Sequence, residues 1–191
     1  MKRLIQCSKP LPLVLLLSLS GCVEVVSEKP QTVKYDHVLL LPGREIKIID
    51  QSFAANIPDL PSDRLPLQQL KNWAKHTLRS DETVGHNTIS FIIEEASLTR
   101  VDPPAPKFFE LDPGPSKYTI NYAVRLNSQA TLPAKVAAHV EIEVEEIRFV
   151  PYGASEYRRT TELEDGINTA INKLGNELER KARTYLGAVA K

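Results

Sequence analysis

The sequence predicts an α+β fold in which one antiparallel β-sheet carries two helices on a single face, the second helix being long and C-terminal. Three stretches in the middle of the chain alternate apolar and polar residues, as strands with one buried and one solvent-facing side do. Two other stretches repeat apolar residues every three or four positions, which is typical of amphipathic helices. Since a one-sided sheet needs an apolar cover, we expect the helices to provide it.

The first elements are short. Residues 38–41 form an apolar run that stops at a Pro-Gly pair, which fits a buried strand or a loop pinned to the core. Residues 45–49 alternate polar and apolar and give a modest strand signal. Residues 65–79 switch to helical spacing, with Asp63 as the expected N-cap and Pro66 tolerated in the first turn.

The next two stretches predict neighbouring strands. Residues 89–98 alternate, but the phase slips by one position at Glu94–Glu95, which indicates a β-bulge. Residues 118–126 alternate without interruption and predict a strand with one dry and one wet face.

The third alternating stretch, residues 136–149, changes phase near its end. Up to Glu145 the apolar residues hold the even positions, and after Glu146 they hold the odd ones. The sequence therefore predicts that Ile147 and Phe149 return to the buried side of this strand.

Three glutamates occupy alternate positions of that third strand, at Glu141, Glu143 and Glu145. Carboxylates in this arrangement are compatible with a divalent cation, but a solvated sheet face with ion pairs to Arg125 or Arg100 is the simpler interpretation. The four histidines lack H-x-x-x-H or H-E-x-x-H spacing, and no G-x-S-x-G motif is present. We therefore expect no metal, no cofactor and no enzymatic activity.

The C-terminal stretch predicts a helix of about seven turns. Apolar residues recur at three and four positions from Leu163 to Val189, and residues 161–164 have the form of a capping box. Acidic residues dominate the first turns and basic residues the last, as the helix dipole favours. Gly166 and Gly175 each cost about 1 kcal/mol relative to alanine, so tertiary packing must stabilise this helix.

The connection formed by residues 101–117 is far longer than a hairpin needs. Five prolines surround Phe108 and Phe109. Long connections of this kind are usually functional or disordered. The aromatic pair is a candidate partner-binding loop that docks in a groove or dips into a bilayer surface, or else it folds back over the open end of the core.

The N-terminal segment predicts export. A basic start, residues 1–3, precedes an apolar run, residues 13–19, which ends in small residues and a cysteine. The run is about half of the roughly 20 residues that a membrane-spanning helix needs, so a cleaved signal peptide over residues 1–21 is expected. Without it the chain has 170 residues and a net charge of −3, which excludes a basic footprint for nucleic acid.

The end of that segment, Leu19, Ser20, Gly21 and Cys22, resembles the lipobox of bacterial lipoproteins. The resemblance implies that Cys22 is acylated on sulfur and that the chain is then cut just before it. Cys22 becomes the mature N-terminus, and its diacylglyceryl thioether and amide-linked acyl chain anchor the protein in a membrane. An ordinary cysteine after an ordinary signal peptide is the alternative. In diderm bacteria an aspartate after the acylated cysteine retains lipoproteins in the inner membrane. Val23 stands there, which implies the outer membrane, facing the periplasm, in a host that sorts by that rule, and the inner membrane or cell membrane in a host that sorts differently.

The predicted organisation is thus a leader (1–21), a lipidated tether (22–36) and one periplasmic domain (37–191). With Cys7 in the leader and Cys22 acylated, the domain has no free thiol or disulfide. Behind a lipobox, this order of elements is similar to auxiliary lipoproteins of ABC-type transport systems and to the lipoprotein of the lipopolysaccharide translocon. The likeness implies a non-catalytic binding subunit with an envelope protein partner; a periplasmic lipid carrier and an envelope hydrolase are alternatives.

Overall fold

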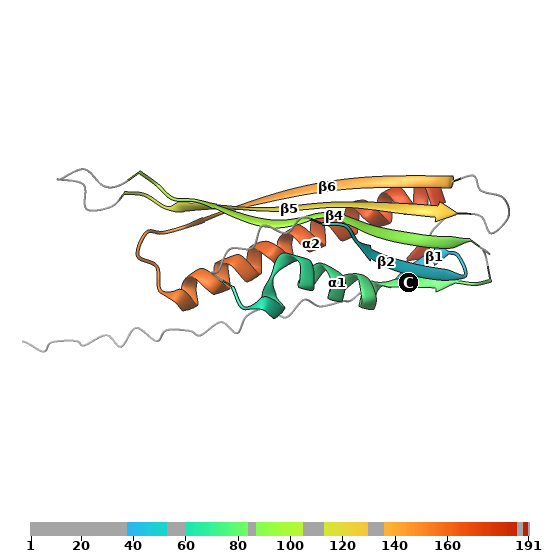
Figure 1. Cartoon of the computed structure of the whole chain (residues 1–191), viewed down its shortest axis with the longest axis horizontal. Helices are drawn as coiled ribbons and strands as arrows, with labels where there is room; N and C mark the ends of the chain where they lie inside the picture. The colour runs from blue at the N-terminus through green and yellow to red at the C-terminus, as the bar shows by residue number, and fades with distance from the viewer. Residues whose placement is uncertain are drawn as a thin grey trace, which may run out of the picture.

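The computed structural model describes residues 38–52, 60–83, 87–104, 113–129, 136–186 and 189–190. The elements in chain order are β1 (Leu39–Pro42), β2 (Glu45–Asp50), the 3-10 turn η1 (Ser62–Arg64), α1 (Pro66–Thr77), β3 (Leu78–Asp81), β4 (Thr88–Val101), β5 (Ser116–Gln129), β6 (Val136–Val150), α2 (Glu156–Leu186) and β7 (Val189–Ala190). The predicted α+β class with a long C-terminal helix is confirmed (Figure 1). The predicted leader and tether, residues 1–36, lie outside the described residues.

The strands form two sheets where the sequence predicted one. The main sheet has the order β2-β4-β5-β6 and the small sheet has the order β3-β1-β7. The long pairs β4/β5 and β5/β6 are antiparallel, but β2 runs parallel to β4 and β1 runs parallel to β3. The parallel β2/β4 pair follows from α1, which lies between the two strands in sequence and supplies the crossover that parallel pairing requires.

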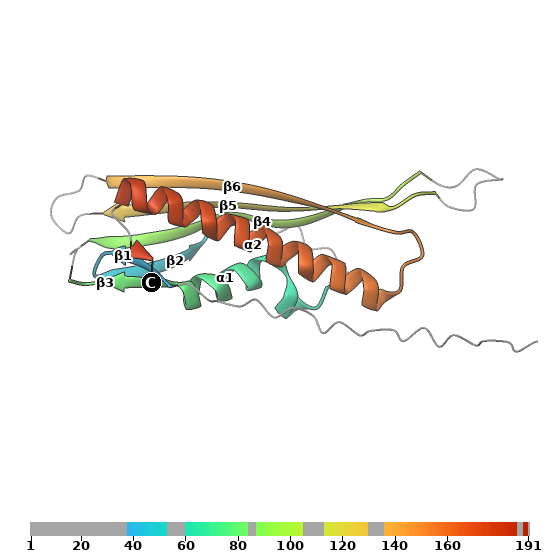
Figure 2. The same cartoon turned by 180° about the vertical axis from the view of Figure 1, so that it is seen from behind.

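Both helices cover the same face of the main sheet (Figure 2). Alternate side chains of β5 point to this inner face and are buried, as predicted; they are Tyr118, Ile120, Tyr122, Val124 and Leu126. In α2 the residues at helical spacing are buried against them, among them Leu163, Ile167, Ile171, Leu174 and Leu178. One continuous apolar core results between the sheet and the helices.

The phase slip in β4 is the predicted bulge, because the β4/β5 register shifts between Ile93 and Glu95. The phase change predicted in β6 is wrong. The β5/β6 register continues without a shift from Val150 to Ala138, so Glu146 stays on the inner face and is nearly buried.

Ion pairs explain how a carboxylate occupies that inner position. Lys173 of α2 reaches Glu146 with Nζ 2.6 Å from Oε2, and Arg148 lies on the other side with Nε 3.2 Å from Oε1. Arg148 also donates to the Thr169 hydroxyl at 2.8 Å. Because a buried charge is tolerated only when it is paired, these contacts replace the apolar packing that the sequence pattern suggested.

The start and the end of α2 differ from the prediction. The helix begins at Glu156, and the Ser155 hydroxyl accepts a hydrogen bond from the Arg158 amide at 3.3 Å, so Ser155 is the cap. Thr161, predicted at the cap, lies inside the helix and donates to the carbonyl of Tyr157. The helix ends at Leu186, and Val189, expected on its apolar stripe, belongs to β7, which pairs with β1.

The predicted cap of α1 is also wrong. Asp63 lies in η1, and the N-cap position is Leu65, which makes no side-chain capping bond; Pro66 is the first helical residue, where a missing N–H costs nothing. The buried Tyr122 hydroxyl donates to the Pro66 carbonyl at 3.1 Å. Burial raises the pKa of Tyr122, so its hydroxyl remains a neutral donor that ties the sheet to the start of α1.

Gly166 sets the distance between α2 and the sheet. A Cβ atom at this position would lie 2.8 Å from both Ile120 Cδ1 and Arg148 Cγ. We expect Gly166→Ala to lower the free energy of unfolding by about 1–2 kcal/mol, because an overpacking cost of about 1–3 kcal/mol exceeds the gain in helix propensity. In Gly175→Ala the new atom meets only the rim of Trp73 at 3.1 Å, and urea denaturation should show a smaller change. Equal losses of stability in the two variants would contradict the closer approach of α2 to its neighbours at Gly166.

An ion pair joins the end of β2 to α1, with Lys71 Nζ 2.7 Å from Asp50 Oδ2. The Lys71 ammonium, together with the Ser52 hydroxyl, lowers the pKa of Asp50 to about 2. Since this folded value lies below the unfolded value of 3.8, the pair stabilises the fold above pH 4, and its contribution is lost as the pH falls from about 4 to 2. We expect Asp50→Asn and Lys71→Met each to remove a pH-dependent contribution of up to about 1 kcal/mol in thermal melts over that range.

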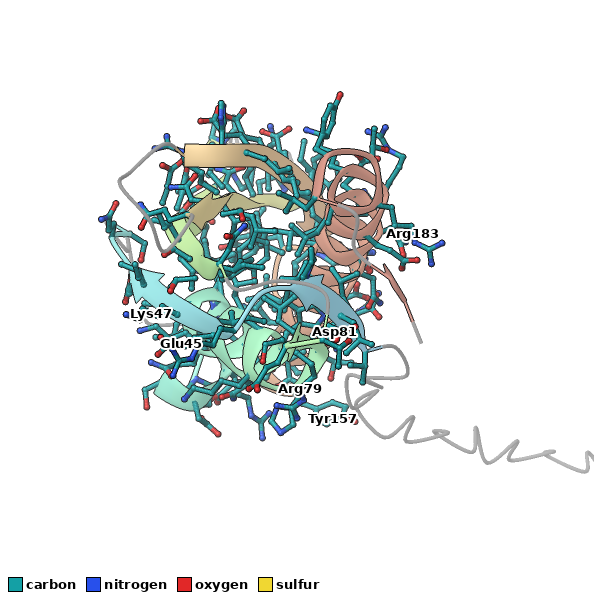
Figure 3. The ribbon with its side chains drawn as sticks, turned by 90° about the vertical axis from the view of Figure 1, so that its right-hand side faces the viewer. Glu45, Lys47, Arg79, Asp81, Tyr157 and Arg183 are labelled. Carbon is teal, nitrogen blue, oxygen red and sulfur yellow. The ribbon has the colours of Figure 1, made fainter. Side chains whose placement is uncertain are left out.

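The free edge of β6 lies beside α2. Figure 3, which looks along the strands, shows the helix at the side of β6. Lys181 of α2 donates from Nζ to the Glu141 carbonyl of β6 at 2.6 Å. Because a helix and a lysine already cover this part of the edge, an added strand would have to displace them.

Candidate docking surface

None of the site residues predicted from the sequence falls within the described residues. The lipobox residues Leu19, Ser20, Gly21 and Cys22 and the aromatic pair Phe108 and Phe109 all lie outside them. The strand ends that flank the 101–117 connection are described. They belong to the main sheet, whose outer face is the candidate docking surface.

The outer face is the side of the main sheet opposite the helices (Figures 1 and 2). The side chains that alternate with the buried ones point to it, and no helix or strand of the described part of the chain lies on it. Its exposed and half-buried members on β5 and β6 include Thr119, Asn121, Ala123, Asn127, His139, Glu143 and Glu145. A rigid sheet thus presents a long surface of fixed side chains to solvent.

A row of ion pairs crosses the middle of this face. Arg125 on β5 places Nη2 2.7 Å from Glu94 Oε1 on β4 and Nε 2.9 Å from Glu141 Oε1 on β6. The pairing of the acidic strand with Arg125, preferred from the sequence, is therefore confirmed. Glu143 and Glu145 are exposed and have no ion pair with any described residue. The face thus presents one guanidinium paired with two carboxylates, and two exposed carboxylates that make no ion pair with a described residue.

Arg100, the other arginine considered for the acidic strand, is engaged elsewhere. Its Nε lies 2.6 Å from Asp102 Oδ1, and its guanidinium lies over the Tyr118 ring, 5.6 Å from the centroid. The Ser116 hydroxyl donates to the same Asp102 oxygen at 2.7 Å. Ser116 and Arg100 together hold the pKa of Asp102 below its ordinary value, so the base of the 101–117 connection is fixed by a carboxylate.

An apolar patch lies at the end of the outer face where β6 ends. Across the sheet, Val101 of β4 pairs with Lys117 of β5, and Lys117 pairs with Phe149 of β6. Two residues further along each strand, Thr119 of β5 lies between Thr99 of β4 and Ile147 of β6. We call Val101, Lys117, Ile147 and Phe149 the distal patch. Val101 and Phe149 are each 62 % exposed and Ile147 is 37 % exposed.

The alternation in the sequence predicted Ile147 and Phe149 in the core, so this patch was not expected. The signal that would have found it is the i, i+2 pair of opposite charges at Glu146 and Arg148. Two such residues on one strand face neutralise each other and allow the alternation to continue unbroken.

The described histidines make no common site. His76 on α1 has its ring Nδ1 2.7 Å from the Asn72 carbonyl, whereas His139 is exposed on β6. Among the residues that the structure describes, no group of three or more histidine, cysteine, aspartate or glutamate side chains is arranged to hold a metal ion. Within the same residues, no helix has the length and apolarity to cross a membrane.

Comparisons with known proteins give only distant similarities. No family model and no curated sequence matches the chain. Among solved structures, a protein from Helicobacter pylori described as a neuraminyllactose-binding hemagglutinin homolog is 8 % identical, covers 81 % of this chain and 91 % of its own, and has a TM-score of 0.42.

Two other similar structures are bacterial lipoproteins. The rare lipoprotein B from Shewanella oneidensis is 14 % identical over 75 % of this chain and 98 % of its own, with a TM-score of 0.39. An uncharacterized lipoprotein B from Nitrosomonas europaea is 13 % identical over 76 % of this chain and 86 % of its own, with a TM-score of 0.38. The chain is thus similar in outline to bacterial lipoproteins, at a level that carries no argument about its activity.

Proposed function

We propose that this protein is a lipid-anchored accessory subunit of the bacterial envelope, which binds a protein partner on the outer face of its main sheet and performs no catalysis. The observation that carries the proposal is that both helices cover one face of the sheet, whereas on the opposite face the described side chains of β5 and β6 are exposed or half-buried (Figure 2). A transport or envelope-assembly complex is the proposed setting. The anchor is Cys22, and the outer membrane, facing the periplasm, is the proposed location.

The charges of the outer face suit recognition by a partner. Arg125 is held from both sides by Glu94 and Glu141, so little side-chain entropy is lost when a partner binds there. The carboxylates of Glu143 and Glu145, which make no ion pair with a described residue, extend the same face along β6. Charges of this kind contribute more to the choice of a partner and to its rate of association than to affinity. Because carboxylates predominate here, they favour a partner with a basic surface.

A lipid carrier is the alternative, and the contacts between α2 and the sheet argue against it. An acyl chain lodged between them would need a gap, yet the backbone of α2 at Gly166 comes so close that a Cβ would lie 2.8 Å from Ile120 Cδ1. Nine residues further along, the same helix lies against Trp73 at Gly175. These two close approaches favour the docking function.

A charge reversal on the outer face tests the proposal. Glu143→Lys reverses the charge of an exposed side chain on the outer face, and Asn172→Lys places a lysine at an exposed position of α2 as the control for an added ammonium group. We expect affinity isolation from crosslinked envelopes to recover a common partner with the wild type and with the α2 variant, and much less of it with Glu143→Lys. Equal recovery from all three proteins, or recovery of the protein alone, would argue against docking on this face.

A further inference from the structure

We propose that the distal patch contacts the surface of the bilayer, so that this end of the domain rests on the membrane while the rest of the outer face remains open to a protein. The inference goes beyond the proposed function, because it assigns a second membrane contact besides the lipid anchor. It rests on the chemistry of the patch, on the charges around it and on the reach of the tether.

The patch has the composition of a membrane-interface contact. Phe149 and Val101 are well exposed at the ends of one row, and Lys117 lies between them. Lys117 is exposed and makes no ion pair with a described residue. An apolar pair that enters the boundary of the acyl chains, with an ammonium between them at the level of the phosphates, is the arrangement that interfacial segments use.

Neighbouring side chains support this contact. Tyr152, in the turn after β6, is 62 % exposed, and tyrosine is enriched at the membrane–water interface. Arg158 is exposed in the first turn of α2 and adds a second cation at this end. Two acids lie nearby: Asp102 is already paired with Arg100, and Glu156 is exposed. On the outer face of β6, Glu145 lies two residues before Ile147 and borders the patch, whereas Glu143 and Glu141 lie further along the strand.

The tether is long enough to allow the contact. The described chain begins at Val38, so 16 peptide units separate it from Cys22, a reach of about 55 Å when fully extended. The 31 residues of α2, which run along most of the main sheet (Figure 1), span only about 46 Å. A domain anchored at Cys22 therefore reaches its own membrane with the distal patch.

A bilayer fits this patch better than a second copy of the chain. Two patches facing each other about a two-fold axis would bring two Lys117 ammonium groups together between apolar side chains, and like charges in that position oppose association. Lipid phosphates instead supply the opposite charge, and the headgroup boundary accepts Phe149 and Val101.

Fluorescence quenching by lipid tests the proposal on the full, lipidated protein. Phe149→Trp places a reporter in the patch, and Tyr185→Trp is the matched control, because Tyr185 is 65 % exposed near the opposite end of α2. Both variants keep the buried Trp73 as a common background. Each protein is reconstituted into mixed phosphatidylethanolamine and phosphatidylglycerol vesicles with or without brominated acyl chains.

We expect brominated lipid to cause a loss of emission in Phe149→Trp beyond that of the wild type, and none in Tyr185→Trp. Adding Lys117→Glu to Phe149→Trp should reduce that loss.

Equal quenching of the two reporters, or no quenching of either in protein that remains vesicle-bound, would overturn the inference and leave docking on the outer face intact. Protein that fails to bind the vesicles at all would overturn both this inference and the anchor. If the reporter at position 149 is shielded only when an envelope protein is added, and not by lipid, the patch is a protein contact and the bilayer assignment is overturned.

Discussion

Replacing Trp73 with alanine is expected to lower the free energy of unfolding by about 3–5 kcal/mol, the cost of removing a large buried aromatic side chain. Trp73 is 6 % exposed, with its ring centroid 6.3 Å from that of Phe91 on β4 and its rim against Gly175 of α2. It therefore joins α1, α2 and the main sheet, and its loss leaves a cavity where the three meet.

Urea denaturation followed by far-UV circular dichroism measures this loss without depending on tryptophan emission. Tyr185→Ala is the control, because that exposed side chain should change stability by no more than about 0.5 kcal/mol. A Trp73→Ala protein as stable as the control would show that the helices are not held on the sheet at this point.

Replacing Cys22 with serine is expected to move the protein from the membrane to the soluble fraction. Each buried CH₂ group contributes about 0.8 kcal/mol to membrane binding, and a single acyl chain binds only reversibly, so loss of all chains should change the partition by many orders of magnitude. Fractionation of cells followed by a salt wash measures the effect.

Cys7→Ser is the matched control for the anchor, because Cys7 lies in the predicted leader and its loss should leave the protein on the membrane. Mass spectrometry of the native protein adds an independent check of the acylated terminus. A Cys22→Ser protein that remains membrane-bound after the wash, or a native chain that starts at another residue without acyl groups, would contradict the predicted anchor.

The sequence predicted the parts of the fold in which one local pattern decides the structure. Uninterrupted alternation identified β5 with its buried face, and the slip at Glu94–Glu95 identified the bulge in β4. The apolar residues of α2 also recur at helical spacing over most of its length, so its existence and its buried side were predictable. In each case the side that is buried follows directly from the period of the pattern.

The remaining features depend on contacts between distant segments. The sequence pattern suggested a phase change at Glu146, but Lys173, 27 positions away, neutralises that carboxylate and keeps the strand regular. Residues 161–164 read as a capping box, yet Ser155 caps the helix one and a half turns earlier. Val189 follows the apolar period of α2 but pairs with Leu40 in the small sheet.

The distal patch was missed for the same reason. Ile147 and Phe149 are exposed because Glu146 and Arg148 are held on the inner face, and the contact of Lys173 with Glu146 has no local sign in the sequence beyond the opposite charges at 146 and 148. The acidic strand, in contrast, was correctly expected to be a solvated face that pairs with Arg125. A local pattern therefore predicted the charged part of the surface but not its apolar end.

Binding of a partner to the outer face of the main sheet can be tested by site-specific photocrosslinking in intact cells. Photoreactive side chains are placed at Glu141, Glu143 and Glu145 on the outer face, and at the exposed positions Asn172 and Asn176 on α2. We expect adducts with one envelope protein from the β6 positions and none from the helix. Adducts from the α2 positions alone, or equal adducts from both sets, would contradict binding on the outer face.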